Sequence, residues 1–174
     1  LKWCGREKDY IEVSLDGKLH ATLHPDREEF PHLHSPPFFA DLKLNGAAHP
    51  ELRIDGFVKN ARVLSRSFSA DHATDKLWLH AEDAALVGDG SDATRLLFAV
   101  VDRFGTPRAF AGGAVTLKID GPAEIMGDNP FSLEESGGVG AVFVRTLPGR
   151  AGMVQVEARH TSLGSASVVI EVSV

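Results

Sequence analysis

Adjacent glutamates occur twice in the sequence, at Glu28-Glu29 and at Glu134-Glu135. Two carboxyl groups that face each other can act as general acid and general base. Neighbouring residues of an extended chain point to opposite faces, however, and both pairs lie in polar stretches where solvated charges need no partner. We therefore expect solvated loop charges here and assign no catalytic residue.

Histidines form a second group of side chains with possible chemistry. His32 and His34 would share one face if residues 31–35 were extended, and His20 and His24 lie nearby in the sequence. Zinc sites normally use three or four protein ligands, and the sequence places no third ligand beside this pair. We favour a surface histidine cluster over a metal site.

Asp89, Asp92 and Asp102 could offer oxygen ligands to calcium, but the alternating ligand run of a calcium loop is missing. We expect these carboxylates to cap turns instead. Cys4 is the only cysteine, so an internal disulfide and a thiolate metal cluster are excluded. No Gly-x-Ser-x-Gly pattern supports a serine nucleophile. The sequence therefore indicates neither a metal nor a cofactor.

Aromatic side chains are the residues that a sugar-binding module would use, because flat apolar rings stack on sugar faces. Trp3, Tyr10, Trp78, Phe38 and Phe39 are the candidates. Trp78 lies inside an alternating segment, and we expect it in a core. Phe38 and Phe39 are neighbours, so at most one of them can face solvent. Trp3, Phe38 and Phe39 remain as possible sugar-stacking residues.

The composition of the 174-residue chain is that of an ordinary globular protein, with 43% hydrophobic and 24% charged residues. A net charge of −6 leaves no large basic surface for nucleic acid. No apolar run approaches the roughly 20 residues that cross a bilayer, so no membrane contact is expected. The first residues lack the apolar core of a signal peptide, and the chain begins without Met, which suggests a fragment of a longer polypeptide. Cytoplasmic and secreted locations both stay open.

Short segments that alternate apolar and polar residues recur along the chain, and this pattern is typical of β-strands. The first two, at 10–15 and 19–24, flank Asp16-Gly17, a pair that favours a hairpin turn. Residues 26–37 contain three prolines and predict an irregular loop. Further strands are expected near 40–44, 51–58, 61–69, 77–81, 94–101, 114–119, 141–145, 153–159 and 166–172, with a short one after Gly121-Pro122.

The fold class is therefore predicted as all-β, since only residues 82–86 could form even one helical turn. Residues 70–76 are polar and suit a boundary between domains. Each half carries about six or seven candidate strands, roughly the number that closes two sheets over one core. We expect two immunoglobulin-like β-sandwich domains in tandem, at residues 1–75 and 76–174.

Several motifs of the second half resemble those of the C-terminal domain of glycoside hydrolase family 2. They begin with Leu86-Val-Gly-Asp-Gly-Ser-Asp and Val101-Asp-Arg-Phe-Gly-Thr-Pro-Arg, and continue at 121–131, 137–145 and 163–170. The first half resembles the Ig-like domain that precedes it in many β-galactosidases, through residues 11–18, 35–39 and 51–58. The later motifs also resemble bacterial Ig-like repeats of adhesins.

The resemblance implies a non-catalytic accessory region, because the acid and nucleophile glutamates of the family lie in a (β/α)₈ barrel that has no counterpart in this sequence. Its partners would be the barrel and other domains of the parent chain, with a homo-oligomer possible through the parent. Two alternatives stay open. One is a carbohydrate-binding module, and the other is an adhesin-type Ig-like spacer, although the halves share no evident repeat.

Overall fold

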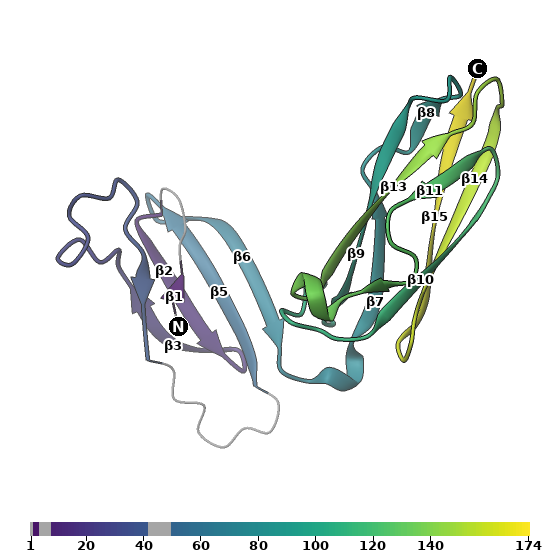
Figure 1. Cartoon of the computed structure of the whole chain (residues 1–174). Coiled ribbons are helices and arrows are strands. Elements are labelled where there is room, and N and C mark those ends of the chain that lie inside the picture. Colours follow the sequence, from purple (N-terminus) through teal and green to yellow (C-terminus); the bar gives the residue numbers. More distant parts are fainter. Residues whose placement is uncertain (1, 4–7, 42–49) are drawn as a thin grey trace. The chain divides into compact units, whose positions relative to one another are not determined.

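A computed structural model describes residues 2–3, 8–41 and 50–174 of the chain, which forms two compact units, Leu1–Ala73 and Thr74–Val174 (Figure 1). Strands make up nearly all of the regular structure. Two short 3-10 helices, His72–Thr74 and Glu134–Ser136, are the helical segments of the described residues. The predicted all-β class is confirmed.

The first unit contains a four-stranded antiparallel sheet and a two-stranded one. The hairpin turn between β2 and β3 falls at Asp16 and Gly17, whose φ angles of 48° and 77° suit this tight turn. The sheet orders are β3-β2-β5-β6 and β1-β4. The strands are β1 (Lys2–Trp3), β2 (Tyr10–Leu15), β3 (Lys18–Leu23), β4 (Phe38–Phe39), β5 (Glu51–Val58) and β6 (Ala61–Ser69).

The core of the first unit lies between β4 and the four-stranded sheet. Phe38 of β4 is fully buried and packs with Ile11, Val13 and Ile54, which come from β2 and β5. These residues alternate with more polar ones along their strands, as a strand with one buried face requires. The two sheets thus enclose one small apolar cluster.

The second unit is a larger β-sandwich with sheet orders β12-β10-β14-β15-β8 and β11-β13-β9-β7. All pairings are antiparallel except that of β8 with β15, which is parallel. The strands are β7 (Lys76–Ala81), β8 (Ala85–Val87), β9 (Ala93–Val101), β10 (Ala114–Asp120), β11 (Ala123–Met126), β12 (Phe131–Ser132), β13 (Val139–Thr146), β14 (Gly152–His160) and β15 (Gly164–Ser173).

The core of this sandwich draws on both sheets and is centred on Phe98 of β9. Its ring meets the ring of Phe131 edge to face, with centroids 5.2 Å apart. Gly140 lies opposite Phe98 in the sheet, and a Cβ at that glycine would come within 2.1 Å of the ring. The glycine in the 137–145 motif is therefore needed for the close approach of the Phe98 ring.

Strand predictions differ from the structure at a few places. The strand expected near 40–44 appears as β4 at Phe38–Phe39, while 42–44 lie outside the described residues. Glu82 and Ala84 are bends and β8 follows, so no helical turn forms there. The sequence did not indicate β1, β8 or β12, each of which has only two or three residues.

Candidate functional site

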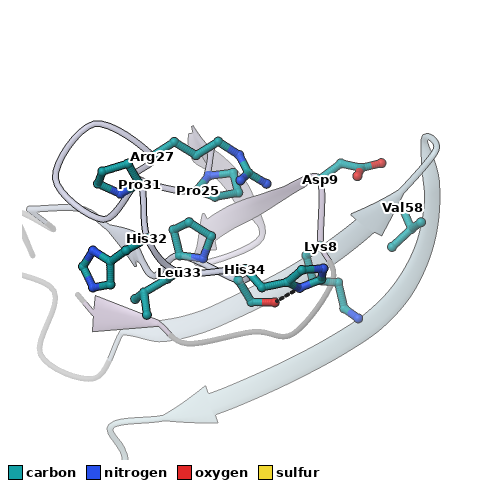
Figure 2. A pocket seen from close by; sticks show the side chains of 11 residues that line it. Lys8, Asp9, Pro25, Arg27, Pro31, His32, Leu33, His34 and Val58 are labelled. Carbon is teal, nitrogen blue, oxygen red and sulfur yellow. Dashed lines mark hydrogen bonds between the residues drawn. The ribbon is translucent and has the colours of Figure 1, made fainter.

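An open pocket of about 670 Å³ lies in the first unit, beside the loop between β3 and β4 (Figure 2). The loop passes over the residues that lead into β2 and over the end of β5. Prolines at both ends and in the middle hold the loop off the sheet, because they cannot join a central strand. Polar lining comes from Lys8, Asp9, Arg27, His32, His34 and Ser35, and apolar lining from Pro25, Pro31, Leu33, Pro36 and Val58.

The acidic lining residue is already engaged by the backbone. Oδ2 of Asp9 accepts a hydrogen bond from the backbone N–H of Lys59 at 2.6 Å. Lys59 and Asn60 form the turn after β5 with positive φ angles, and the carboxylate supports this turn. The pocket therefore offers more hydrogen-bond donors than acceptors to a ligand.

The two histidines of the pocket do not form the pair that strand spacing would give. Residues 31–32 form a turn and 34–35 a bend instead of an extended segment, so His32 and His34 are not related by a strand repeat. Nδ1 of His34 lies 3.4 Å from the Ser35 hydroxyl, whereas His32 lies against Phe30 with centroids 6.4 Å apart. Figure 2 shows the two rings on different sides of the loop.

The possible sugar-stacking residues meet different environments. Phe38 is fully buried, so its ring presents no face to a sugar, whereas Phe39 is 40% exposed and stacks on Phe30 at 5.8 Å. Trp3 pairs with Phe38 through the backbone of β1, and its side chain lies outside the described residues. Tyr10 stacks on Phe57 with centroids 4.7 Å apart. Sugar stacking at Phe39 and Trp3 stays a prediction.

The expectation that Trp78 lies in a core is wrong. Leu77 and Leu79 on either side of it enter the core of the second unit, so alternation directs Trp78 outward, where it is 38% exposed. Its ring stacks on that of His80, with centroids 5.5 Å apart and an interplanar angle of 17°. Trp78 therefore belongs to the surface of β7.

Trp78 is part of an apolar outer face on the four-stranded sheet of the second unit. Along β13, Val139 and Phe143 alternate with the buried Val142 and Val144. Phe143 lies beside Met126 of β11. The side chains of Met126, Val139 and Phe143 are 41–49% exposed. We define the outer face by Met126, Trp78, Leu97, Val139, Ala141 and Phe143.

The three aspartates singled out in the sequence serve turns. Oδ1 of Asp89 accepts hydrogen bonds from the N–H groups of Ser91 and Asp92 at 2.7 and 2.8 Å. These bonds, that from Ser91 first, hold the pKa of Asp89 below its ordinary value of 3.8. Asp92 accepts the N–H of Val87 at 2.8 Å, as expected for a capping residue.

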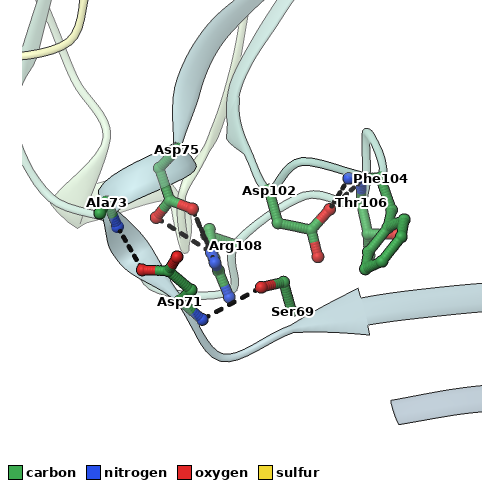
Figure 3. Close-up of polar contacts among 8 residues, drawn as sticks. All are labelled: Ser69, Asp71, Ala73, Asp75, Asp102, Phe104, Thr106 and Arg108. Atoms are coloured by element: carbon green, nitrogen blue, oxygen red, sulfur yellow. Dashed lines mark hydrogen bonds and ion pairs between the residues drawn. The ribbon is translucent and has the colours of Figure 1, made fainter. Parts of the chain in front are cut away.

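The motif at 101–108 also has an architectural role (Figure 3). Oδ1 of the buried Asp102 accepts the N–H groups of Phe104 and Thr106 at 2.9 and 3.0 Å, which closes the loop after β9. Arg108 binds Asp75 just before β7, with Nε 2.9 Å from Oδ1. The motif thus ties the loop after β9 to the residue that precedes β7.

The two Glu-Glu pairs remain on the surface, as their polar surroundings indicate. All four side chains are exposed, and Oε1 of Glu134 lies 3.4 Å from the N–H of Gly113. Within the described ranges, no three His, Cys, Asp or Glu side chains gather as a metal site would require. No helix among the same residues is long and apolar enough to span a membrane.

Sequence reasoning did not single out Lys8, Arg27 or Val58, which line the pocket. The only available signal was the proline-rich loop itself, since its charged residues and histidines had no evident partner. The loop residues come close to Lys8 only because β2 pairs with both β3 and β5. Such long-range pairing cannot be inferred from local spacing.

Comparison with curated proteins gives β-galactosidases as relatives. The chain is 30% identical over 143 residues to a β-galactosidase from Thermoanaerobacter pseudethanolicus, covering 78% of this chain and 19% of that protein. It is 31% identical over 150 residues to a β-galactosidase from Rhizobium meliloti, covering 82% of this chain and 19% of that protein. The chain thus spans about a fifth of the length of these curated relatives.

Solved structures share the fold across nearly the whole chain. A β-glycosidase from Bacteroides vulgatus superposes with a TM-score of 0.68 at 14% identity, covering 94% of this chain and 21% of that one. A family 2 glycosyl hydrolase from Bacteroides cellulosilyticus gives 0.66 at 21% identity, with 94% and 23% covered. The model of glycoside hydrolase family 2 C-terminal domain 5 matches residues 77–169. The chain therefore belongs to glycoside hydrolase family 2, as part of its C-terminal accessory region.

Proposed function

We propose that the chain is a non-catalytic structural region of a β-galactosidase-type enzyme, in which residues outside this chain hydrolyse β-glycosidic bonds. The β-galactosidases that it resembles support this activity for the parent. The loop and turn roles of its carboxylates support the lack of an acid–base pair in the part of the chain that the structure describes. The two domains that we propose, 1–75 and 76–174, agree with the division into compact units.

The observation that carries this function is the outer face of the second unit. Trp78, Val139 and Phe143 keep 38–49% of their surface exposed although large apolar side chains gain by burial. The five-stranded sheet is different, because its outward positions include Lys118, Glu157 and many other polar residues. A face that is more apolar on one sheet than on the other is expected when one side of a sandwich contacts protein and the other contacts water.

The occupant that we assign to the outer face is another part of the same polypeptide. The relatives continue for about four times the length that this chain spans, so a large surface of further domains is present in each of them. Two ion pairs, Arg95 with Glu82 and Arg145 with Glu124, border the apolar residues and give the face a polar rim. An apolar centre with a polar rim is typical of protein interfaces.

The test uses the double variant Trp78→Thr with Phe143→Thr, because threonine keeps the strand preference while removing the rings. We introduce the double variant into the intact family 2 polypeptide that carries this chain. We expect it to have a lower thermal midpoint and faster proteolysis than the same polypeptide without the substitutions. The isolated chain with the same changes should unfold as before, because the lost surface is exposed there. It should also hydrolyse no nitrophenyl glycoside.

The matched control is Met153→Thr with Val169→Thr, which removes two side chains that are 60% and 51% exposed on the five-stranded sheet. This control should leave the intact polypeptide unchanged. Equal effects of both double variants would contradict the assignment. If the isolated chain dimerises in sedimentation and only Trp78→Thr with Phe143→Thr abolishes the dimer, the face belongs to a second copy instead.

A carbohydrate-binding role is the second candidate, favoured by the exposed ring of Phe39 and the adjoining pocket. Association of the parent into a homo-oligomer remains a prediction, to be checked by sedimentation of the intact polypeptide. No contact among the described residues favours an adhesin-type spacer over these roles.

A further inference from the structure

The pocket of the first unit combines cationic side chains, imidazoles and a hydroxyl around one opening (Figure 2). We propose that it binds a carbohydrate bearing an oxyanion group, a carboxylate or a sulfate. The carbohydrate part of this inference rests on the proposed role in a carbohydrate-active enzyme. The oxyanion part rests on the side chains of the pocket alone.

The charge of the pocket lining is opposite to that of the chain as a whole. Lys8 and Arg27 bring two positive charges to one opening, whereas the whole chain carries a formal net charge of −6. Asp9 supplies the single negative charge, and its Oδ2 is occupied by the N–H of Lys59. Among the described residues, no carboxylate forms an ion pair with Arg27. Arginine binds carboxylates and sulfates well because its guanidinium offers several N–H donors in one plane.

An imidazole and a hydroxyl complete the oxyanion site. His34 and Ser35 lie on the same stretch of loop, with Nδ1 and Oγ 3.4 Å apart, and both line the pocket. An imidazole and a hydroxyl can each donate one hydrogen bond to an anionic oxygen and accept one from a sugar hydroxyl. Such groups fix the orientation of a polar ligand in a pocket.

Aromatic rings lead away from the pocket wall and provide the sugar part of the site. His32 lines the pocket and lies 6.4 Å from Phe30, which in turn stacks on Phe39 at 5.8 Å. Phe39 is 40% exposed. A bound oligosaccharide could therefore place its anionic group beside Arg27 while a neighbouring sugar ring covers the exposed aromatic surface.

The volume and the exposure of the lining set the expected strength of binding. About 670 Å³ is enough for one or two sugar rings, since ligand pockets generally have volumes of about 300–1,000 Å³. Arg27, His32 and His34 are exposed, so water competes for their hydrogen bonds. We therefore expect binding in the millimolar range and strong weakening by salt.

The experiment titrates the isotopically labelled chain with trigalacturonic acid, galactotriose and inorganic phosphate, and follows backbone amide signals by NMR. Trigalacturonic acid should shift the signals of residues around Arg27, His34 and Lys8, whereas galactotriose should shift them little. Arg27→Gln should weaken the binding of trigalacturonic acid by about tenfold, which is the usual effect of losing one charge-assisted hydrogen bond. Sulfated galactose tests the second oxyanion, with the same expected dependence on Arg27.

The control variant is Arg66→Gln, which removes the same charge from an exposed position on β6, outside the pocket. It should leave binding within about twofold, because exposed charges at a distance are screened by salt. An equal loss of affinity in Arg27→Gln and Arg66→Gln would show that only the net charge of the chain matters, and this would overturn the site. No shift with any anion would also overturn it.

The phosphate titration separates this inference from the proposed function. Phosphate binding as tight as trigalacturonic acid, and equally dependent on Arg27, would refute the carbohydrate assignment while leaving a small-anion site. The proposed role of the outer face does not depend on either result, because Trp78→Thr and Phe143→Thr change the second unit, whereas the pocket lies in the first.

Discussion

The two units of the chain use the same alternating strands but differ greatly in how much apolar surface they bury. In the second unit, seventeen buried residues from both sheets form one core. Among the described residues of the first unit, only Ile11, Val13, Phe38 and Ile54 are buried in its core. The first unit therefore depends on each of its few core residues much more strongly. A large core also leaves the second unit free to expose apolar side chains on its outer face.

The sharpest test of this comparison is to remove one buried ring from each unit. Phe38→Ala and Phe98→Ala should each cost about 3–5 kcal/mol of unfolding free energy, through lost burial and a residual cavity. A domain of about 70 residues seldom has more than about 3–5 kcal/mol in total. Phe38→Ala should therefore unfold the first unit, whereas Phe98→Ala should leave the second unit folded but less stable.

Denaturant unfolding followed by NMR resolves the two units and measures this difference. The signals of the unchanged unit provide the internal control in each variant. A first unit that keeps its dispersed signals with Phe38→Ala, or a second unit that loses them with Phe98→Ala, would contradict the comparison.

A smaller effect is expected from polar contacts that complete the sheets of the second unit. The side-chain amide of Asn129 substitutes for a strand partner of β10, because it accepts the N–H of Leu117 at 2.9 Å and donates to its carbonyl at 2.8 Å. Asn129→Ala should destabilise the second unit by about 1–3 kcal/mol, since both backbone groups lose a partner. Calorimetry measures the change.

Asn129→Asp is the matched variant for this prediction, because it keeps an acceptor for the Leu117 N–H and removes the donor. At neutral pH it should be at least as destabilising as Asn129→Ala, because its second carboxylate oxygen then faces the Leu117 carbonyl oxygen with no hydrogen between them. A midpoint unchanged by Asn129→Ala would show that the core alone determines the stability of the second unit.

The smallest effect concerns the turn between β8 and β9. Because the pKa of Asp89 is lowered in the folded chain, its charged form is favoured by folding. This stabilisation is complete above the ordinary pKa of 3.8 and is lost as the pH falls through the lowered folded value. An NMR titration of the Asp89 carboxyl carbon should give a midpoint below 3.8.

Asp89→Asn is the control for this titration, since it keeps a side-chain oxygen for the Ser91 N–H and cannot ionise in this range. The acid-induced loss of protection in the turn should become weaker in this variant. A midpoint at or above the ordinary value would refute the role of the two N–H donors.

The sequence predicts the fold better than the candidate site, for reasons visible at particular residues. Leu77 and Leu79 mark a strand by alternation, but the alternation also allows Trp78 to be either inside or outside, and the two leucines determine the outcome. β8 is not predicted from the sequence because its partner, β15, lies more than eighty residues later. The pocket depends on a loop whose prolines exclude regular structure, so spacing could not show that Arg27 and Lys8 lie around one opening.

β15 lies between β14 and β8 in the five-stranded sheet, and Ile170 and Val172 on it are buried in the core. β8, at Ala85–Val87, has no antiparallel neighbour and depends on this one late strand for its sheet pairing. During synthesis on the ribosome, β8 can therefore join its sheet only after residues 164–173 have emerged. A stop codon before β15 would leave β8 without its strand partner and would remove Ile170 and Val172 from the core.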